Sequence, residues 1–91
     1  MYTNSLRKHR KAAGLRQLDV ARLIGLEGST ERLSKWENGA ADPNIDNLFR
    51  LLALYKVSPQ ELYPEKWQAI VNPISSSTVE TLLEAHIPVE G

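Results

Sequence analysis

The stretch from Ser29 to Gly39 constrains the chain most, because it carries signals for both ends of one short helix. Ser29 can serve as an N-cap, and Asn38-Gly39 supplies the left-handed conformation that closes many helices. At about 100° per residue, Leu33 and Trp36 fall on one side of such a helix. The pattern predicts a helix that is anchored by this apolar side. Its opposite side carries groups that form hydrogen bonds, namely Glu31, Ser34, Lys35 and Asn38.

Capping residues and glycines divide the rest of the chain into further short helices. Ser58-Pro59-Gln60-Glu61 is the clearest signal, since it combines an N-cap serine, proline at the first helical position and glutamate at the third. The sequence therefore predicts an all-α fold with a compact five-helix domain over residues 1–63. The expected helices run from a cap at Thr3 or Asn4 to about Ala13, from Gln17 to Ile24, from Ser29 to Asn38, from a cap at Asn44 to Tyr55, and onward from Ser58.

Residues 64–91 are expected to form a C-terminal extension with one or two short helices. Pro64 can open the first of them, which should end before Pro73, and Ser77-Thr78-Val79-Glu80 repeats the capping pattern. Trp67 lies on the apolar side of the first helix. It can pack on its own domain or on a second copy of the chain, and the sequence leaves both alternatives open.

Composition excludes several classes of protein. A length of 91 residues suits one small domain, and the lack of cysteine excludes disulfides and thiolate metal sites. His9 and His86 do not make a ligand set, and no catalytic triad or phosphate-binding glycine loop is visible. We therefore expect no enzyme, no metal and no cofactor. Because neither a signal peptide nor a membrane span is visible, we expect a cytoplasmic protein.

The charges are distributed unevenly although the formal net charge is zero. Residues 1–39 carry eight Lys or Arg against four acids, which gives +4, and residues 40–91 carry three against seven, which gives −4. Such asymmetry is expected when one face meets a polyanion. The alternative is a solvated surface with a chance imbalance.

The basic half and the polar side of the 29–38 helix together point to DNA. Lysine can donate to guanine O6 or N7, glutamate can accept from cytosine N4, and serine or threonine can do either or meet a thymine methyl group. We expect this helix to enter the major groove. Arg7, Lys8 and Lys11 lie on the outward side of the first helix and are expected to contact phosphates, with a solvated face as the alternative.

The order of several short motifs resembles the lambda-repressor-like family of helix-turn-helix domains, also called XRE-like or Cro-like. The motifs are Gly14-Leu15-Arg16-Gln17-Leu18-Asp19-Val20-Ala21, then Trp36-Glu37-Asn38-Gly39, and then Pro43. Each is weak alone, but their order and helical phase make the resemblance specific. It covers about Leu6 to Tyr63 and implies a DNA-binding domain of five helices.

The resemblance also implies roles for individual residues. Positions that face base edges match Thr30, Glu31, Ser34 and Lys35, and positions near the DNA backbone match Gln17, Arg32 and Asn38. Gln17 is implied to grip a phosphate and to brace the recognition helix. Glu31 would be repelled by phosphates unless it reads a cytosine or is restrained by Arg32 or Lys35.

Arg10 and Glu37 match a pair that the family joins by an ion pair. The residues themselves agree, because both lie toward the apolar sides of their helices, where an unpaired charge is costly. We therefore predict a structural ion pair that ties the first helix to the recognition helix. Two separate surface charges are the alternative.

The sequence departs from the family pattern in two places. The family usually has Ser or Thr where this chain has Arg16, so the second helix lacks its common cap, although Arg16 is well placed for a phosphate. Glu27-Gly28 also lengthens the turn before the recognition helix by two residues when Ser29 is taken as the cap. If Thr30 is the cap, the outward face is unchanged.

The leading hypothesis is a small bacterial or phage repressor that binds double-stranded DNA as a homodimer. Its half-sites would lie about one helical turn apart, with the fifth helix and the segment from Pro64 onward as the dimer contact. The alternative is a protein-interaction module with the same fold, such as an antitoxin whose acidic C-terminal segment binds a basic toxin.

Overall fold

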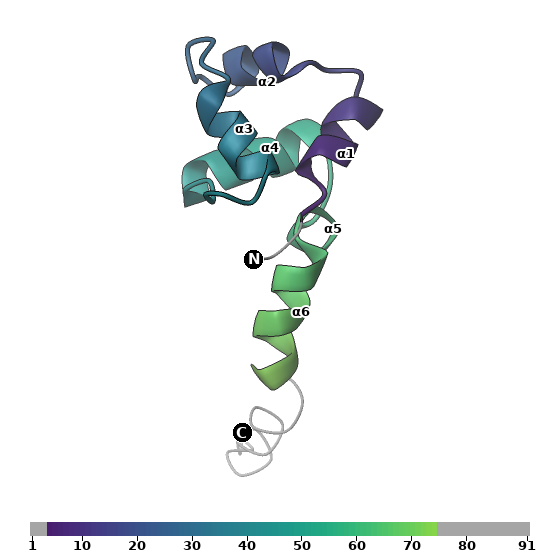
Figure 1. The fold of residues 1–91 in the computed structure, drawn as a ribbon. Helices are drawn as coiled ribbons and strands as arrows, with labels where there is room; N and C mark the ends of the chain where they lie inside the picture. The colour runs from purple at the N-terminus through teal and green to yellow at the C-terminus, as the bar shows by residue number, and fades with distance from the viewer. Residues whose placement is uncertain (1–3, 75–91) are drawn as a thin grey trace, which may run out of the picture.

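The structure of the chain is a computed structural model that describes residues 4–74. This part of the chain contains only helices, in agreement with the predicted all-α class (Figure 1). None of them is long and apolar enough to cross a membrane. The six are α1 (Leu6–Ala12), α2 (Gln17–Leu23), α3 (Glu31–Glu37), α4 (Ile45–Tyr55), α5 (Pro59–Leu62) and α6 (Pro64–Pro73).

The starts of α4 and α5 follow the predicted caps. The Asn44 side chain accepts a hydrogen bond from the Asn47 backbone N–H at 2.8 Å. Ser58 and Glu61 form the predicted reciprocal capping box, in which each side chain accepts from the other residue's backbone N–H. These bonds satisfy backbone donors that the first helical turn leaves without partners.

The predicted cap of α1 is shifted by one residue. Ser5 occupies the N-cap position without a capping side-chain bond, but the Asn4 side chain accepts from the Leu6 N–H at 3.0 Å. Thr3, the other predicted cap, lies outside the described residues. At its other end, α1 is followed by Gly14 with a φ of +75°, as the glycine signal predicts.

The leading N-cap prediction for the recognition helix, Ser29, was wrong, and the alternative that the sequence left open, Thr30, holds. Thr30, not Ser29, precedes α3, and it makes no capping side-chain bond. The cause is the lengthened turn, in which Glu27 and Gly28 both adopt positive φ values, of 56° and 81°. This turn carries the chain further before the helix begins, and Ser29 donates its N–H to the Leu26 carbonyl instead.

The core lies among α1 to α5, and α3 packs against both α1 and α2. A backbone bond of 2.8 Å from the Ser5 N–H to the Leu62 carbonyl joins the start of α1 to α5. The core is therefore closed by elements from both ends of residues 4–62. Its buried apolar residues are Leu6, Val20, Ala21, Ile24, Leu26, Leu33, Trp36, Leu51, Tyr55 and Leu62.

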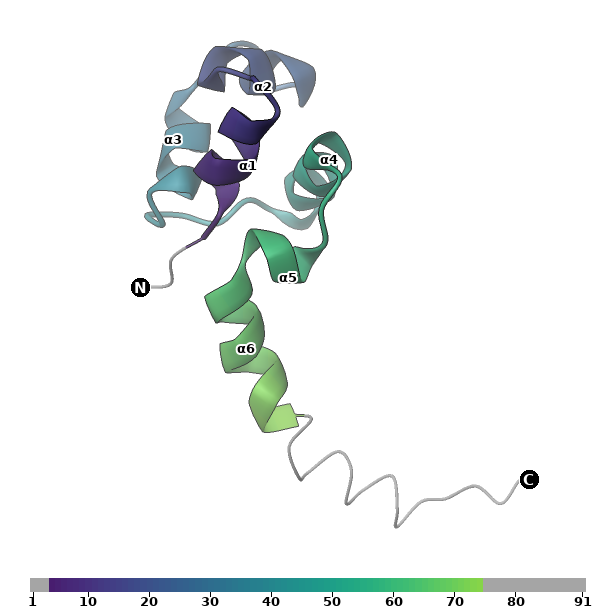
Figure 2. The same cartoon turned by 90° about the vertical axis from the view of Figure 1, so that its right-hand side faces the viewer.

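The last described helix, α6, projects away from this bundle (Figure 2). It contains no buried residue, and it includes Pro73 as its last residue, whereas the sequence predicted an end before this proline. The predicted helix start at Ser77-Thr78-Val79-Glu80 lies outside the described residues.

Candidate nucleic-acid interface

The recognition helix α3 is fixed to the bundle by its apolar side. Leu33 is completely buried and Trp36 is 3% exposed. Beyond the helix, the backbone N–H groups of Ala40 and Ala41 both donate to the Lys35 carbonyl, at 2.9 and 3.3 Å. Both the helix and the chain that leaves it are therefore held in place.

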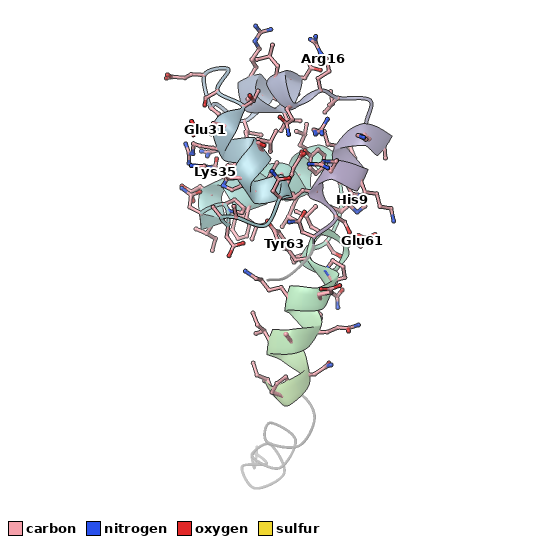
Figure 3. The ribbon with its side chains drawn as sticks, in the orientation of Figure 1. His9, Arg16, Glu31, Lys35, Glu61 and Tyr63 are labelled. Atoms are coloured by element: carbon pink, nitrogen blue, oxygen red, sulfur yellow. The ribbon has the colours of Figure 1, made fainter. Side chains whose placement is uncertain are left out.

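The opposite side of α3 is open to solvent. The Glu31 and Lys35 side chains are 78% and 58% exposed and lie on the outer side of the helix (Figure 3). Ser34 and Thr30 are partly buried at the same surface. Lys35 Nζ lies 3.6 Å from Glu31 Oε2, one helical turn away, so the two side chains form an exposed ion pair on this side of the helix.

Two residues that the resemblance assigned to the DNA backbone have protein partners. The Arg32 guanidinium lies 5.5 Å from the centre of the Trp36 ring, a cation–π contact that covers the anchor of the helix. The side-chain oxygen Oδ1 of Asn38 accepts a hydrogen bond from Arg7 Nη2 at 3.0 Å, and its side-chain Nδ2 donates weakly to Ser34 Oγ at 3.5 Å. Both residues are exposed to solvent.

Arg10 and Glu37 form the ion pair that the sequence led us to expect. Arg10 Nε lies 2.6 Å from Glu37 Oε2, and Arg10 Nη2 donates to Oε1 at 3.1 Å. The side chains are 10% and 0% exposed, so the pair is dry. It ties α1 to the end of α3 in a two-pronged geometry that fixes orientation as well as distance.

Glu37 also accepts hydrogen bonds from two further side chains, one on α2 and one on α1. Gln17 Nε2, at the start of α2, donates to Oε1 at 3.0 Å, and Arg7 Nε lies 3.4 Å from the same oxygen. The Gln17 bond is the brace between α2 and the recognition helix that the resemblance implied. One buried carboxylate therefore joins α1, α2 and α3.

The pKa of Glu37 reflects this competition between burial and hydrogen bonding. Burial acts to raise it, but the hydrogen bonds from Arg10 and Gln17 and the charge of Arg10 outweigh burial. The net result is a pKa below its usual value, so Glu37 is ionised at neutral pH. The Arg10 pKa is raised, chiefly by its hydrogen bond to Glu37.

Arg16 stands at the start of α2 and is held by Asp19. Its backbone N–H donates to Asp19 Oδ2 at 2.8 Å, and its guanidinium lies 3.0 Å from Oδ1. The hydrogen bonds from Arg16 lower the pKa of Asp19 to about 2. At a helix start without a serine or threonine cap, Asp19 thus accepts the backbone N–H of the N-cap residue, Arg16. The Arg16 side chain stays 74% exposed at the outer end of α2 (Figure 3).

The predicted site residues lie on α1 (Arg10, Lys11), α2 and its N-cap (Arg16, Gln17) and α3 and its two cap residues (Thr30, Glu31, Arg32, Ser34, Lys35, Glu37, Asn38). Lys11 is exposed on α1. Sequence reasoning missed the contacts of Arg7 with Glu37 and Asn38, and that of Asn4, whose amide donates to the Trp36 carbonyl at 2.9 Å. Arg7 was recognised only as an outward basic residue. Within residues 4–74, no group of metal-ligating side chains is arranged to hold an ion.

Two short helices joined by a turn, the second of them anchored on its apolar side and polar on the other, define a helix-turn-helix domain. Comparison with protein families agrees, since a helix-turn-helix model matches residues 6–62, well over half of the chain. The chain belongs to this family, HTH_3, which comprises the XRE/Cro/lambda-repressor-like domains. In the comparisons with curated proteins and with solved structures, nothing matches this chain. The family is DNA-binding and non-enzymatic, which indicates a transcriptional regulator.

Proposed function

We propose that this protein is a small repressor of the bacterial or phage cytoplasm, which places α3 in the major groove of a specific operator. The observation that carries the proposal is the division of α3 into two sides. Leu33 and Trp36 are buried, whereas Glu31 and Lys35 protrude and are not covered by any described part of the chain. A helix held in this way can enter the groove without moving.

The side chains on α3 suggest how bases would be read. Lys35 is suited to donate to guanine, Ser34 and Thr30 can donate or accept, and Glu31 can accept from cytosine once Lys35 turns to a base. The residues proposed to grip the backbone are Lys11, Arg16, Gln17, Arg32 and Asn38. Those contacts would supply affinity and salt dependence but little sequence preference.

A homodimer on a pseudo-palindrome is the proposed assembly. One α3 offers only a few base contacts, and two copies with half-sites about 34 Å apart would double them. The proposed contact between subunits lies in α5 and the residues from Pro64 onward, where Ile70 of α6 and Ile74, which follows this helix, are 55% and 52% exposed. We treat residues 64–91 as an extension to the DNA-binding domain 1–63.

Selection of bound sites from random duplex, with the mass of the complex measured in solution, tests this function. We expect one recurrent half-site motif and two chains per duplex. A Ser34→Ala, Lys35→Ala variant should stay folded by circular dichroism but lose the preference for the selected site. Lys56→Ala, which removes an exposed lysine at the end of α4, is the matched control and should keep it. Absence of any enriched motif, or equal preference in both variants, would contradict direct reading by α3.

The exposed apolar side of α6 supports a second candidate, an antitoxin-like module that binds a basic protein through its acidic C-terminal half. Residues 40–91 carry a net charge of −4, and α6 has no buried residue. Such a module would keep its protein partner when α3 is altered. Retention of a basic partner by the Ser34→Ala, Lys35→Ala variant, together with random-duplex binding that does not weaken as salt rises, would favour this candidate.

A further inference from the structure

The hydroxyl group of Ser34, at the outward surface of α3, can meet a base in two ways. It can donate its proton to an acceptor such as guanine O6 or N7, or it can accept an N–H from cytosine N4. A hydroxyl rotates to suit its surroundings, so the neighbouring side chains decide which of the two it does. The neighbours that bear on this choice are Asn38, at the end of the same helix, and Arg7 of α1.

Arg7 is held at the end of α3 by the buried carboxylate of Glu37. Its Nε lies 3.4 Å from Glu37 Oε1, and its Nη2 lies 3.0 Å from Asn38 Oδ1. All the polar hydrogens of a guanidinium are donors and it has no acceptor, so only the oxygen of the Asn38 amide can face it. Arg7 therefore fixes which way round this amide lies.

With its oxygen toward Arg7, the Asn38 amide turns its amino group toward Ser34. The Asn38 Nδ2 lies 3.5 Å from Ser34 Oγ, one helical turn earlier. Because an amino group only donates, the serine oxygen presents a lone pair to it, and the hydroxyl proton points elsewhere. A bond of this length is weak, so it orients the hydroxyl without adding much stability. The second N–H of the amino group is left for the phosphate contact proposed for Asn38.

We propose that Arg7 and Asn38 are positioning residues that make Ser34 a hydrogen-bond donor toward DNA. Arg7 orients the Asn38 amide, and this amide orients the Ser34 hydroxyl toward the acceptor edge of a base. The base that Ser34 contacts is then guanine or thymine, which offer only acceptors in the major groove, and not cytosine, which offers a donor. The inference rests on the proposed function, because it requires α3 to read bases, and it adds which bases Ser34 selects.

Asn38→Asp reverses the orientation of the hydroxyl and is the decisive variant. Aspartate keeps one oxygen for Arg7 and turns a second oxygen, an acceptor, toward Ser34. The hydroxyl proton then points to the carboxylate, and the serine lone pairs are left for an N–H of cytosine.

The measurement compares affinities for the selected duplex and for the same duplex with cytosine at the position that Ser34 reads. We expect the native chain to prefer the selected duplex by about fivefold, and Asn38→Asp to prefer the cytosine duplex. The ratio is the readout, because an added carboxylate near phosphates weakens binding to both duplexes alike.

Ser34→Ala identifies that position and separates this inference from the proposed function. Site selection with this variant should relax the preference at one position of the half-site, where the native chain selects guanine or thymine. If no position relaxes, reading by Ser34 and its orientation by Asn38 are both overturned. If one position relaxes but Asn38→Asp keeps the native preference there, only the role of Asn38 is overturned. Native selection of cytosine or adenine at that position would also overturn the inference.

Arg7→Met tests the first step, because methionine fills similar space and donates no hydrogen bond. Glu37 keeps its bonds to Arg10 and Gln17, so the variant should stay folded by circular dichroism. The Asn38 amide can then turn either way, and the preference between the two duplexes should fall to less than twofold. Lys56→Gln removes one positive charge outside the interface and should keep the native preference. Equal weakening of both duplexes by Arg7→Met, with the native ratio unchanged, would overturn the positioning role of Arg7.

Discussion

The carboxylate of Glu37 is fully buried, yet it accepts hydrogen bonds from side chains on α1 and α2 and thereby positions the end of the recognition helix. A buried ion pair is not in itself a large source of stability, because both charges lose their hydration. Removing one member is costly, since the other remains buried without its partner. The consequence is that Glu37 controls both the stability of the domain and the placement of α3.

We predict that Glu37→Gln lowers the free energy of unfolding by about 3 kcal/mol, because Arg10 keeps its charge and loses its counterion in a dry site. Urea unfolding followed by circular dichroism measures the change. Glu31→Gln is the matched control: its side chain is 78% exposed, and the loss should stay under about 1 kcal/mol. A loss for Glu37→Gln as small as that of the control would contradict a dry, structural pair.

The lowered pKa of Glu37 predicts a pH dependence of stability. A carboxylate whose pKa is lower in the folded chain than in the unfolded chain stabilises the fold at pH values above 4.5, its usual pKa. This contribution disappears as the pH falls through the lowered pKa of the folded chain. The difference in unfolding free energy between the native chain and Glu37→Gln should therefore be constant near neutral pH. It should shrink below about pH 4.5. Urea titrations at a series of pH values test this, and a difference independent of pH down to pH 2 would contradict it.

Contacts between single residues could be predicted from the sequence where each partner has a position on its own predicted helix that calls for a partner. Arg10 and Glu37 could be paired because both charges fall on apolar sides of predicted helices. Arg7 and Asn4 have no such position. Their bonds to Glu37, Asn38 and the Trp36 carbonyl depend on how closely α1 approaches the end of α3, which is a property of packing.

The bounds of the helices could be predicted from the sequence where a side chain caps the start of its own helix. Asn44 and Ser58 cap α4 and α5 through contacts only three residues long. The start of α3 was predicted wrongly because Glu27 adopts a positive φ, which is uncommon for a residue with a side chain and carries no sequence signal. The turn geometry, not the local capping preference, decides where that helix begins.

Ser58 caps α5, whereas Ser29 does not cap α3, so alanine substitutions at these two serines should lower the free energy of unfolding by different amounts. Ser58→Ala should cost about 1 kcal/mol, because it removes one half of a reciprocal capping box at the start of α5. Ser29→Ala should be close to neutral, since Ser29 was predicted as a cap but precedes the true N-cap position. Thermal or urea unfolding of both variants checks this, and equal losses would show that Ser29 does cap α3 in solution.

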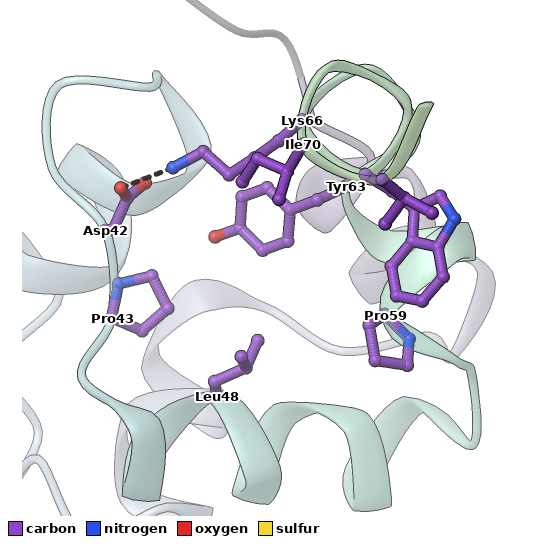
Figure 4. Close-up of a pocket in the computed structure, with 9 residues that line it drawn as sticks. Asp42, Pro43, Leu48, Pro59, Tyr63, Lys66 and Ile70 are labelled. Atoms are coloured by element: carbon purple, nitrogen blue, oxygen red, sulfur yellow. Dashed lines mark hydrogen bonds and ion pairs between the residues drawn. The ribbon is translucent and has the colours of Figure 1, made fainter. Parts of the chain in front are cut away.

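In the whole molecule, the arrangement of α6 is what the sequence did not predict. Apolar spacing indicated a helix after Pro64, but periodicity alone does not say whether its apolar side meets the bundle. The structure directs α6 away from the bundle, and an apolar groove lined by Trp67 (Figure 4) and the Lys66–Asp42 ion pair lie where the helix meets the domain (Figure 2). The family fold was predictable from motif order, whereas this extension follows no motif.

The uneven charge of the molecule makes salt dependence the test of its proposed backbone contacts. A lysine that neutralises one phosphate releases about one counterion, so Lys11→Gln should weaken binding to all duplexes by the same factor and reduce the slope of log affinity against log salt by about 1. Lys56→Gln removes the same charge from the end of α4, outside the proposed interface, and should leave the slope unchanged. Titrations at several salt concentrations with both a selected and a scrambled duplex separate the two effects. If both variants changed the slope equally, the dependence would come from net charge alone. Lys11 would then have to be removed from the proposed DNA interface.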